Sequence, residues 1–334
     1  MGGAAVEQQI QQSILAVDLG GTSILLGEVS LDGKVLHTQS YPTDTATQAA
    51  AMENIGKAIQ HYIDTVSRKA RELVAIGIGV VGRVDRANGV WMEIEPGKTN
   101  PTDVARIIEQ RFGLPCGIDN DVSCATLAEL KHGWGTESKD FIYLNVGTGI
   151  AAGFVVNGAI IEGSHFNAGE IGHMVVDMNS DAICACGRRG CVERLASGLG
   201  LHERVISLKG EYPDTAIAIE DGQRVSAQSI FKHAAEGDPL AQRVTEEGSR
   251  ALAAAIMNMV RVSDPDTIVL GGGVGGNAYF TELVEQHLNP KTMRFVTNGI
   301  ARTKQSTPEA GLVGAAMVGL EAWTLRRGVL SHDE

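Results

Sequence analysis

The sequence contains the same succession of apolar runs and glycine turns twice. The first copy is ILAVDLGGTSILLGEVSLDGKVL at residues 14–36, and the second is FIYLNVGTGIAAGFVVNGAII at residues 141–161. Each copy has an apolar run up to Asp18 or Asn145, a glycine turn with a threonine, a second apolar run and a tight turn. Chance likeness between two glycine-rich hairpins is the alternative. We interpret the pattern as two related α/β domains that face each other across a cleft, each contributing one phosphate-type turn.

The spacing of apolar residues predicts the elements that surround these two copies. We expect strands at 76–81, 116–118 and 267–270, with helices at 47–70, 103–112, 121–132 and 311–325 and a helix-rich stretch over 195–262. The predicted organisation is a polar tail at 1–13, a smaller domain at 14–120 and a larger domain at 121–310. The larger domain carries a cysteine-rich loop at 173–191, and the last helix can pack back on the smaller domain.

The net charge and the cysteine content indicate which partners the protein can bind and in which cell compartment we expect it. A net charge of −12 argues against nucleic acid, because phosphate backbones require clustered lysine and arginine. The first residues lack the basic and apolar segments of a secretion signal, and the cysteine count of 5 is odd, so we expect reduced thiols and a cytoplasmic protein. The uncharged run at 141–161 is rich in glycine and asparagine, which favours two strands over a membrane span.

The two glycine turns are candidates for a nucleotide phosphate clamp. Glycines allow the backbone N–H groups to approach an anion closely, and a carboxylate at a strand end can hold Mg²⁺. Taken alone, the first turn is equally typical of an ordinary β-turn. Two such turns, one from each half, favour binding of nucleotide phosphates, while the P-loop and dinucleotide fingerprints are absent. The clamp residues are Asp18, Gly20, Gly21, Thr22, Gly147, Thr148 and Gly149.

Two further segments combine a strand end with residues that suit ligands. Asp121 follows Asp119 and Asn120 at the start of a predicted helix, where a carboxylate is kept ionised and can orient a hydroxyl group. Helix capping is the alternative, and spacing alone favours it. The segment Gly271–Gly273 follows a buried strand and permits close approach of an adenine or ribose, or simply connects strand to helix.

His173, Cys184, Cys186 and Cys191 form a set typical of structural zinc. Three thiolates and one imidazole fill the four positions of a closed tetrahedral site, which leaves none for a catalytic water. Cysteine redox chemistry is the alternative. We therefore predict a zinc ion that fixes a loop.

Taken together, these segments resemble the ROK family of repressors, open-reading-frame proteins and kinases, from about Ile14 to about Ala322. GH-x₁₀-CACGRRGCVE is similar to the zinc signature of the family. DLGGT, DND, NVGTGI, AGEIGH, LGGGV and AGLVGAAMVGL stand in the family order. The resemblance implies a two-domain actin-like ATPase fold of the ribonuclease H-like, hexokinase type, with a cleft between the domains.

The resemblance also implies an ATP-dependent sugar kinase similar to glucokinases and N-acetylhexosamine kinases. Asp121 looks like the catalytic base, the clamp residues hold ATP and Mg²⁺, and Gly271, Gly272 and Gly273 look like nucleoside contacts. His173 would touch the sugar with one ring nitrogen and zinc with the other. A homodimer or homotetramer is expected, and some relatives use polyphosphate as donor. The residues that look like sugar ligands are Asn120, Glu170, His173 and Glu193.

Some positions depart from the family pattern. Val81 stands where proline is usual, Ser123 stands where asparagine is usual, and no sugar-binding asparagine is present near Ile94 or Glu95. This departure leaves the identity of the sugar open. One hypothesis is that Glu93 or Glu95 faces the sugar and favours an amino or otherwise altered sugar.

Two alternative functions remain. A sugar-responsive repressor of the family would carry a DNA-binding domain, and the 17 residues before Asp18 are too few for one, so we do not expect this function here. A non-catalytic sugar-binding protein is suggested by the missing asparagine, whereas the pairing of Asp121 with two glycine turns favours an enzyme.

Overall fold

A computed structural model of the chain describes residues 11–21, 23–67, 71–95, 97–220, 222–305 and 309–328. It divides into two compact units. Unit 1 contains the described residues up to Ala128, the segment Ser164–Phe166 and the chain from Gln305 onward. Unit 2 contains Glu129–Gly163 and Asn167–Lys304. Of the predicted polar tail, residues 1–10 lie outside the described residues, and Gln11–Ser13 already belong to the first strand.

Unit 1 is built on a five-stranded sheet with the order β3-β2-β1-β4-β8. The first three strands are antiparallel, and β4 and β8 extend the sheet in parallel to β1. Alternate side chains of β1 point to opposite faces, so Leu15 and Val17 join the core with helices α1 and α2, while Ile14 and Ala16 are buried on the other face. The elements are β1 (Gln11–Leu19), β2 (Ser23–Ser30), β3 (Val35–Pro42), α1 (Gln48–Thr65), β4 (Arg71–Val80), α2 (Val104–Phe112) and β8 (Cys116–Asn120).

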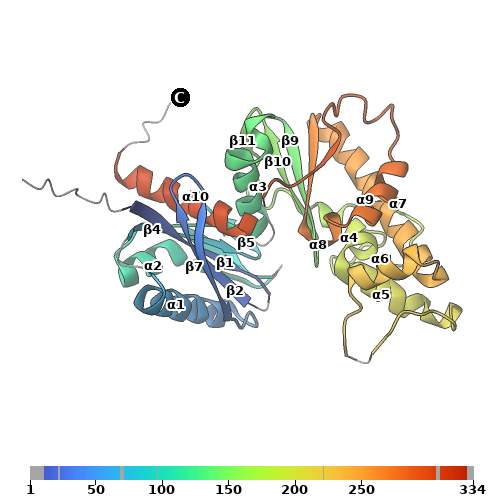
Figure 1. The fold of residues 1–334 in the computed structure, drawn as a ribbon, viewed down its shortest axis with the longest axis horizontal. Helices are drawn as coiled ribbons and strands as arrows, with labels where there is room; N and C mark the ends of the chain where they lie inside the picture. Colours follow the sequence, from blue (N-terminus) through green and yellow to red (C-terminus); the bar gives the residue numbers. More distant parts are fainter. Residues whose placement is uncertain are drawn as a thin grey trace, which may run out of the picture. The chain divides into compact units, whose positions relative to one another are not determined.

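Helix α10 (Glu309–Arg326) covers the second face of this sheet (Figure 1). It packs on β1, β4 and β8, although it is nearly 200 residues away from the last of these in the sequence. Its backbone lies so close to β4 that a Cβ at Gly77 would stand 1.8 Å from the carbonyl oxygen of Ala315. Glycine is therefore required at this contact. The structure places the predicted C-terminal helix in unit 1.

A second, three-stranded antiparallel sheet lies between β4 and α2 in the sequence of unit 1. It consists of β5 (Arg83–Asp85), β6 (Val90–Glu93) and β7 (Thr99–Asp103). No strands were predicted over residues 83–103. These strands are short, and their register is broken by irregularities between Arg83 and Val84 and between Trp91 and Glu93.

Unit 2 repeats the sheet of unit 1 with the order β11-β10-β9-β12-β13. Here too the first three strands are antiparallel, and the last two run parallel to the central strand. The repeat predicted from the sequence is thus confirmed at the level of strand order. Asn145 on β9 pairs with Gly271, as Asp18 on β1 pairs with Gly79. The strands are β9 (Phe141–Val146), β10 (Ile150–Val156), β11 (Ala159–Ile160), β12 (Thr267–Gly271) and β13 (Ile300–Arg302).

Helices make up most of the rest of unit 2 (Figure 1). The longest, α7, packs against α4, α5, α6 and α9 and anchors the core of the unit. These helices are α4 (Val192–Ala196), α5 (Gly198–Leu208), α6 (Ala227–Ala235), α7 (Pro239–Ser263), α8 (Gly272–Gly275) and α9 (Ala278–Gln286). Helix α3 (Asp121–His132) begins in unit 1 and ends in unit 2. Among the described residues, no helix has both the length and the apolar character that crossing a membrane requires.

Candidate functional site

The predicted catalytic segment lies where β8 ends and α3 begins. The side-chain oxygen of Asn120 accepts the backbone N–H groups of Val122 at 2.9 Å and Ser123 at 3.3 Å, and its amide donates to the carbonyl of Gly82 at 2.7 Å. Asn120 therefore caps α3, as the alternative interpretation of this segment expected. Asp121 occupies the first turn of the helix, where its Oδ1 accepts the N–H of Val122 at 3.0 Å and the helix dipole favours a carboxylate.

The carboxylate of Asp18 lies at the C-terminal end of β1, beneath the first turn of α10. A Cβ at Gly311 would stand 2.4 Å from Asp18 Oδ2, so the helix leaves room for the carboxylate only because residue 311 is glycine. Burial raises the pKa of Asp18 from 3.8 to about 6. A carboxylate that is costly to ionise and lies at a strand end can bind a divalent cation, which would stabilise its charge.

The first glycine turn connects β1 to β2. The N–H of Gly20 donates to the carbonyl of Ser23 at 2.9 Å and closes the turn. The space where a side chain of Gly21 would stand is open to 4 Å. Thr22, which we assigned to the phosphate clamp, lies outside the described residues. The open position at Gly21 leaves room for a ligand to approach the backbone.

The second glycine turn is held against the start of α5. Gly198 and Leu199, the first residues of α5, donate their N–H groups to the carbonyls of Gly147 at 2.8 Å and Thr148 at 3.2 Å. Gly147 in turn donates to the carbonyl of Gly149 at 3.0 Å. The turn is thus fixed beside the start of α5, where the helix dipole favours an anionic ligand although the first N–H groups of the helix are already engaged.

The third glycine segment is explained in part by packing. A Cβ at Gly271 would stand 2.2 Å from the hydroxyl of Tyr143, and one at Gly272, where φ is +80°, would stand 2.4 Å from the carbonyl of Val146. The connection from β12 to α8 therefore needs both glycines, as the alternative interpretation expected. At Gly273 a Cβ would make an ordinary contact with the amide of Gln228 at 3.6 Å, so packing does not require glycine at this position.

Three of the predicted sugar ligands cluster in unit 2. Glu193 on α4 accepts the N–H of Ile150 at 2.9 Å, and a Cβ at Gly149 would stand 2.8 Å from its carboxylate. Burial raises the pKa of Glu170; the neighbouring His173 acts against this rise, and the negative charge of Glu193 adds to it. Glu193 therefore joins the second glycine turn to Glu170 and His173.

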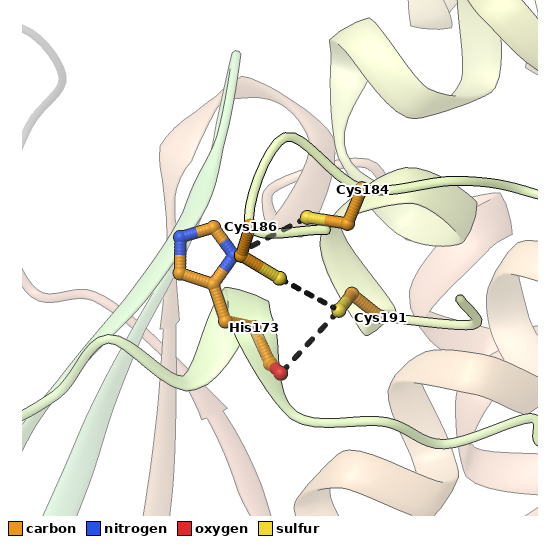
Figure 2. A group of neighbouring side chains, drawn as sticks. All are labelled: His173, Cys184, Cys186 and Cys191. Carbon is orange, nitrogen blue, oxygen red and sulfur yellow. Dashed lines mark hydrogen bonds between the residues drawn. The ribbon is translucent and has the colours of Figure 1, made fainter. Parts of the chain in front are cut away.

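His173 also belongs to the predicted metal site (Figure 2). One ligand atom from each of His173, Cys184, Cys186 and Cys191 lies within 4.8 Å of all the others. Zinc bonds of about 2.3 Å to sulfur in a tetrahedron require ligand atoms about 3.5 to 4 Å apart, so the cluster fits a zinc ion. Figure 2 shows Nδ1 of His173 toward Cys184, 3.3 Å from its sulfur, with the other ring nitrogen pointing away from the cluster.

The electrostatics of the cluster suit a thiolate site. Backbone N–H donation from Arg188 is the main cause that lowers the pKa of the exposed Cys186 to about 6. Burial raises the pKa of Cys191 to about 12, so this thiol would lose its proton only with a cation beside it. None of the five cysteines forms a disulfide.

Residues 93–95, where the family asparagine is missing, contain two glutamates that form ion pairs. Glu93 accepts from Arg83 Nε at 3.0 Å and from the hydroxyl of Thr99 at 2.7 Å, and these contacts lower its pKa. Glu95 pairs with Lys98 at 2.6 Å on the surface. Both carboxylates are thus engaged by neighbouring side chains, and their assignment to an amino or otherwise altered sugar stays a prediction.

Sequence reasoning missed the ion pair next to the predicted catalytic segment. Arg86 lies 3.1 Å from the carboxylate of Asp119 and also binds Glu321 on α10. The partners are 33 and 235 positions away from Arg86, so no local pattern could have pointed to the contact.

The chain is similar in sequence to known proteins over most of its length. The model of the ROK family matches residues 14–321. A glucokinase of Streptomyces coelicolor is 30% identical over 92% of this chain and 97% of its own length. The DNA-binding transcriptional dual regulator NagC of Escherichia coli is 28% identical over 90% of this chain and 73% of its own length.

The solved structure of a ROK family glucokinase from Streptomyces griseus, in complex with glucose and AMPPNP, superposes with a TM-score of 0.76. It is 26% identical, and the match covers 92% of this chain and 99% of that one. The predicted two-domain actin-like α/β fold class is thereby confirmed.

Proposed function

The chain belongs to the ROK family, and on that premise we propose that it transfers the γ-phosphate of ATP to a hydroxyl group of a hexose or hexose derivative. Similarity to glucokinases over nine-tenths of the chain supports a sugar kinase. The observation that carries the proposal is the division of labour at the β8–α3 junction. Asn120 caps the helix, and Asp121 stands beside it in the first turn, where its Oδ1 accepts the N–H of Val122 at 3.0 Å and the direction of the carboxylate is thereby held.

In this proposal Asp121 is the general base. Its carboxylate orients the acceptor hydroxyl and takes its proton as the bond to phosphorus forms. The first turn of α3 keeps the group ionised at neutral pH. The reaction needs no covalent intermediate on the protein, because positioning and charge stabilisation supply most of the catalysis of phosphoryl transfer.

The two glycine turns would bind the phosphates. The backbone at Gly20 and Gly21 offers one approach, and the turn Gly147–Gly149 offers another beside the start of α5. Asp18 would hold Mg²⁺ directly or through a water, which would return its pKa toward the ordinary value. Bound Mg²⁺ neutralises the charge that develops on the phosphate oxygens.

Glu170, His173 and Glu193 would bind the hydroxyl groups of the acceptor. We propose that zinc is held by Nδ1 of His173 and the thiolates of Cys184, Cys186 and Cys191. The ion would supply structural stability alone, because its four ligands come from the protein. With Nδ1 so engaged, the other nitrogen of His173 is fixed in tautomer and direction toward a substrate hydroxyl.

A panel assay tests the proposal and identifies the acceptor. ADP release would be measured with Mg²⁺ and ATP against hexoses, amino sugars and N-acetylated sugars, with polyphosphate as an alternative donor. We expect turnover that depends on one class of sugar and is lost in Asp121→Asn. Absence of turnover with every acceptor, in protein shown to bind ATP, would contradict the kinase.

A sugar-responsive regulator is the second candidate. It is favoured by one observation: identity to NagC, 28%, is nearly the same as identity to the glucokinases. Sugar binding without ADP release, unchanged in Asp121→Asn, would support the regulator, because a sensor does not need a base.

A further inference from the structure

Three carboxylates of unit 1 gather around the thiol of Cys124 on α3. Burial is the main cause that raises the pKa of this thiol; the charges of Asp119, Asp18 and Asp121 raise it further, and the charge of Arg86 lowers it. Arg86 lies 3.1 Å from the carboxylate of Asp119, which is two residues before the proposed base. A cation in such a place offsets repulsion that would otherwise oppose the ionisation of all three.

Arg86 lies in a turn and forms ion pairs with two carboxylates, one from β8 and one from α10. It stands between β5 and β6, donates to Asp119 Oδ2 at 3.1 Å, and binds Glu321 on α10. The side chain of Asp119 is only 8% exposed, and that of Arg86 is 21% exposed. The other oxygen of Asp119 accepts the backbone N–H of Asn120 at 2.7 Å. A chain of contacts thus runs from α10 through Arg86 and Asp119 to the backbone beside Asp121.

We propose that Arg86 is a positioning residue, which holds Asp119 as a carboxylate so that Asp119 fixes the backbone at Asn120 and thereby the direction of Asp121. The inference rests on the proposed function, in which Asp121 is the base. Arg86 itself touches neither phosphate nor sugar in this account.

The physical reason is that the negative charge of Asp119 becomes more costly when the guanidinium of Arg86 is removed. A buried carboxylate that loses a cation bound to it is destabilised, and it responds by taking a proton or admitting water. A protonated carboxyl group is a weaker acceptor for the Asn120 N–H, because hydrogen bonds to ionised acceptors are about twice as strong as those between neutral groups. The junction is then free to shift, and a displacement of about 1 Å at a reacting group reduces the rate by about 100-fold.

Kinetics of Arg86→Met, with a matched control, test the proposal. Arg326 also forms an ion pair between α10 and a neighbouring element, since it binds Glu109 on α2, so Arg326→Met is the same change at another contact of the same helix. We expect kcat of Arg86→Met to fall about 100-fold, with the KM for ATP within about threefold of the parent. Arg326→Met is expected to retain the parental kcat.

Rescue distinguishes positioning from a loss of stability. Adding Asp119→Asn to Arg86→Met removes the uncompensated charge and leaves an amide oxygen to accept the Asn120 N–H. We expect the double variant to recover about 10-fold in kcat over Arg86→Met. A double variant that is as slow as, or slower than, Arg86→Met would overturn the proposal.

Hydrogen exchange gives a readout that does not depend on turnover. The backbone amides of residues 116–124 should exchange at least about 10-fold faster in Arg86→Met, and at the parental rate in Arg326→Met. Parental exchange in Arg86→Met would refute the positioning role even if activity fell. If the parent protein turned over no sugar, the proposed function would fail, while the exchange rates would still decide what Arg86 does to the junction.

Discussion

Replacing Asp18 by asparagine should make the protein more stable and, at the same time, inactive. The carboxylate has a pKa of about 6 in the folded chain against an ordinary value of 3.8, because burial disfavours its charged form. An acid whose pKa is raised by folding destabilises the folded state wherever it is ionised. The penalty is absent below pH 3.8, grows through pH 5 and is complete above about pH 6.

The size of the effect follows from the shift. About 2.2 pKa units at 1.36 kcal/mol each give about 3 kcal/mol at pH 8, and the same relation gives about 1.6 kcal/mol at pH 5. Because Asp18 is not fully screened from solvent, these values are upper limits. Asp18→Asn should therefore gain up to about 3 kcal/mol in free energy of unfolding at pH 8, with about half that gain at pH 5.

Urea unfolding followed by tryptophan fluorescence is a suitable assay, because Trp91 and Trp323 belong to the same unit as Asp18. Asp44→Asn, at an exposed aspartate of that unit, is the control and should change stability by less than about 0.5 kcal/mol at either pH. Loss of stability in Asp18→Asn at pH 8 would refute the reasoning. It would mean that the first turn of α10 stabilises the carboxylate more than burial penalises it.

Two further variants test the metal site and the helix cap. The purified protein should hold about one zinc per chain by elemental analysis; Cys184→Ser should lose the metal and raise the KM for sugar, while Cys116→Ala should keep it, and a metal-free parent would contradict the site. Asn120→Ala should lower the free energy of unfolding by about 1 to 2 kcal/mol, because two N–H groups lose their acceptor. Asn120→Ser keeps a side-chain oxygen at the cap and should recover part of this loss, whereas equal losses in both variants would contradict capping by Asn120.

The repeated pattern around Asp18 and Asn145 predicted most of the fold. Hydrophobic runs and turn chemistry are local features of the sequence, and both constrain the order of strands in a sheet. Because the two halves share the same pattern of runs and turns, their two sheets have the same strand order. The small sheet β5–β7 escaped prediction because its strands are three to five residues long and irregular in register.

The cluster of His173 with three cysteines was predictable, whereas the contacts that support the proposed catalytic segment were not. His173 and the three cysteines fall within a short stretch of sequence whose spacing alone indicates a ligand set. Whether Asn120 or Asp121 caps α3 could be decided only from the structure, because either side chain can cap a helix. Arg86 is brought to Asp119 by tertiary packing, which leaves no periodic signal in the sequence.

The central claim is that Asp121 is the base of a sugar kinase, and one comparison tests it most directly. Sugar-dependent ADP release would be measured for the parent and for Asp121→Asn with the best acceptor, with binding of ATP and sugar measured in both. The account predicts a fall in kcat of at least about 100-fold with both ligands still bound, in the range expected for loss of a general base. Equal turnover in the two proteins would contradict it.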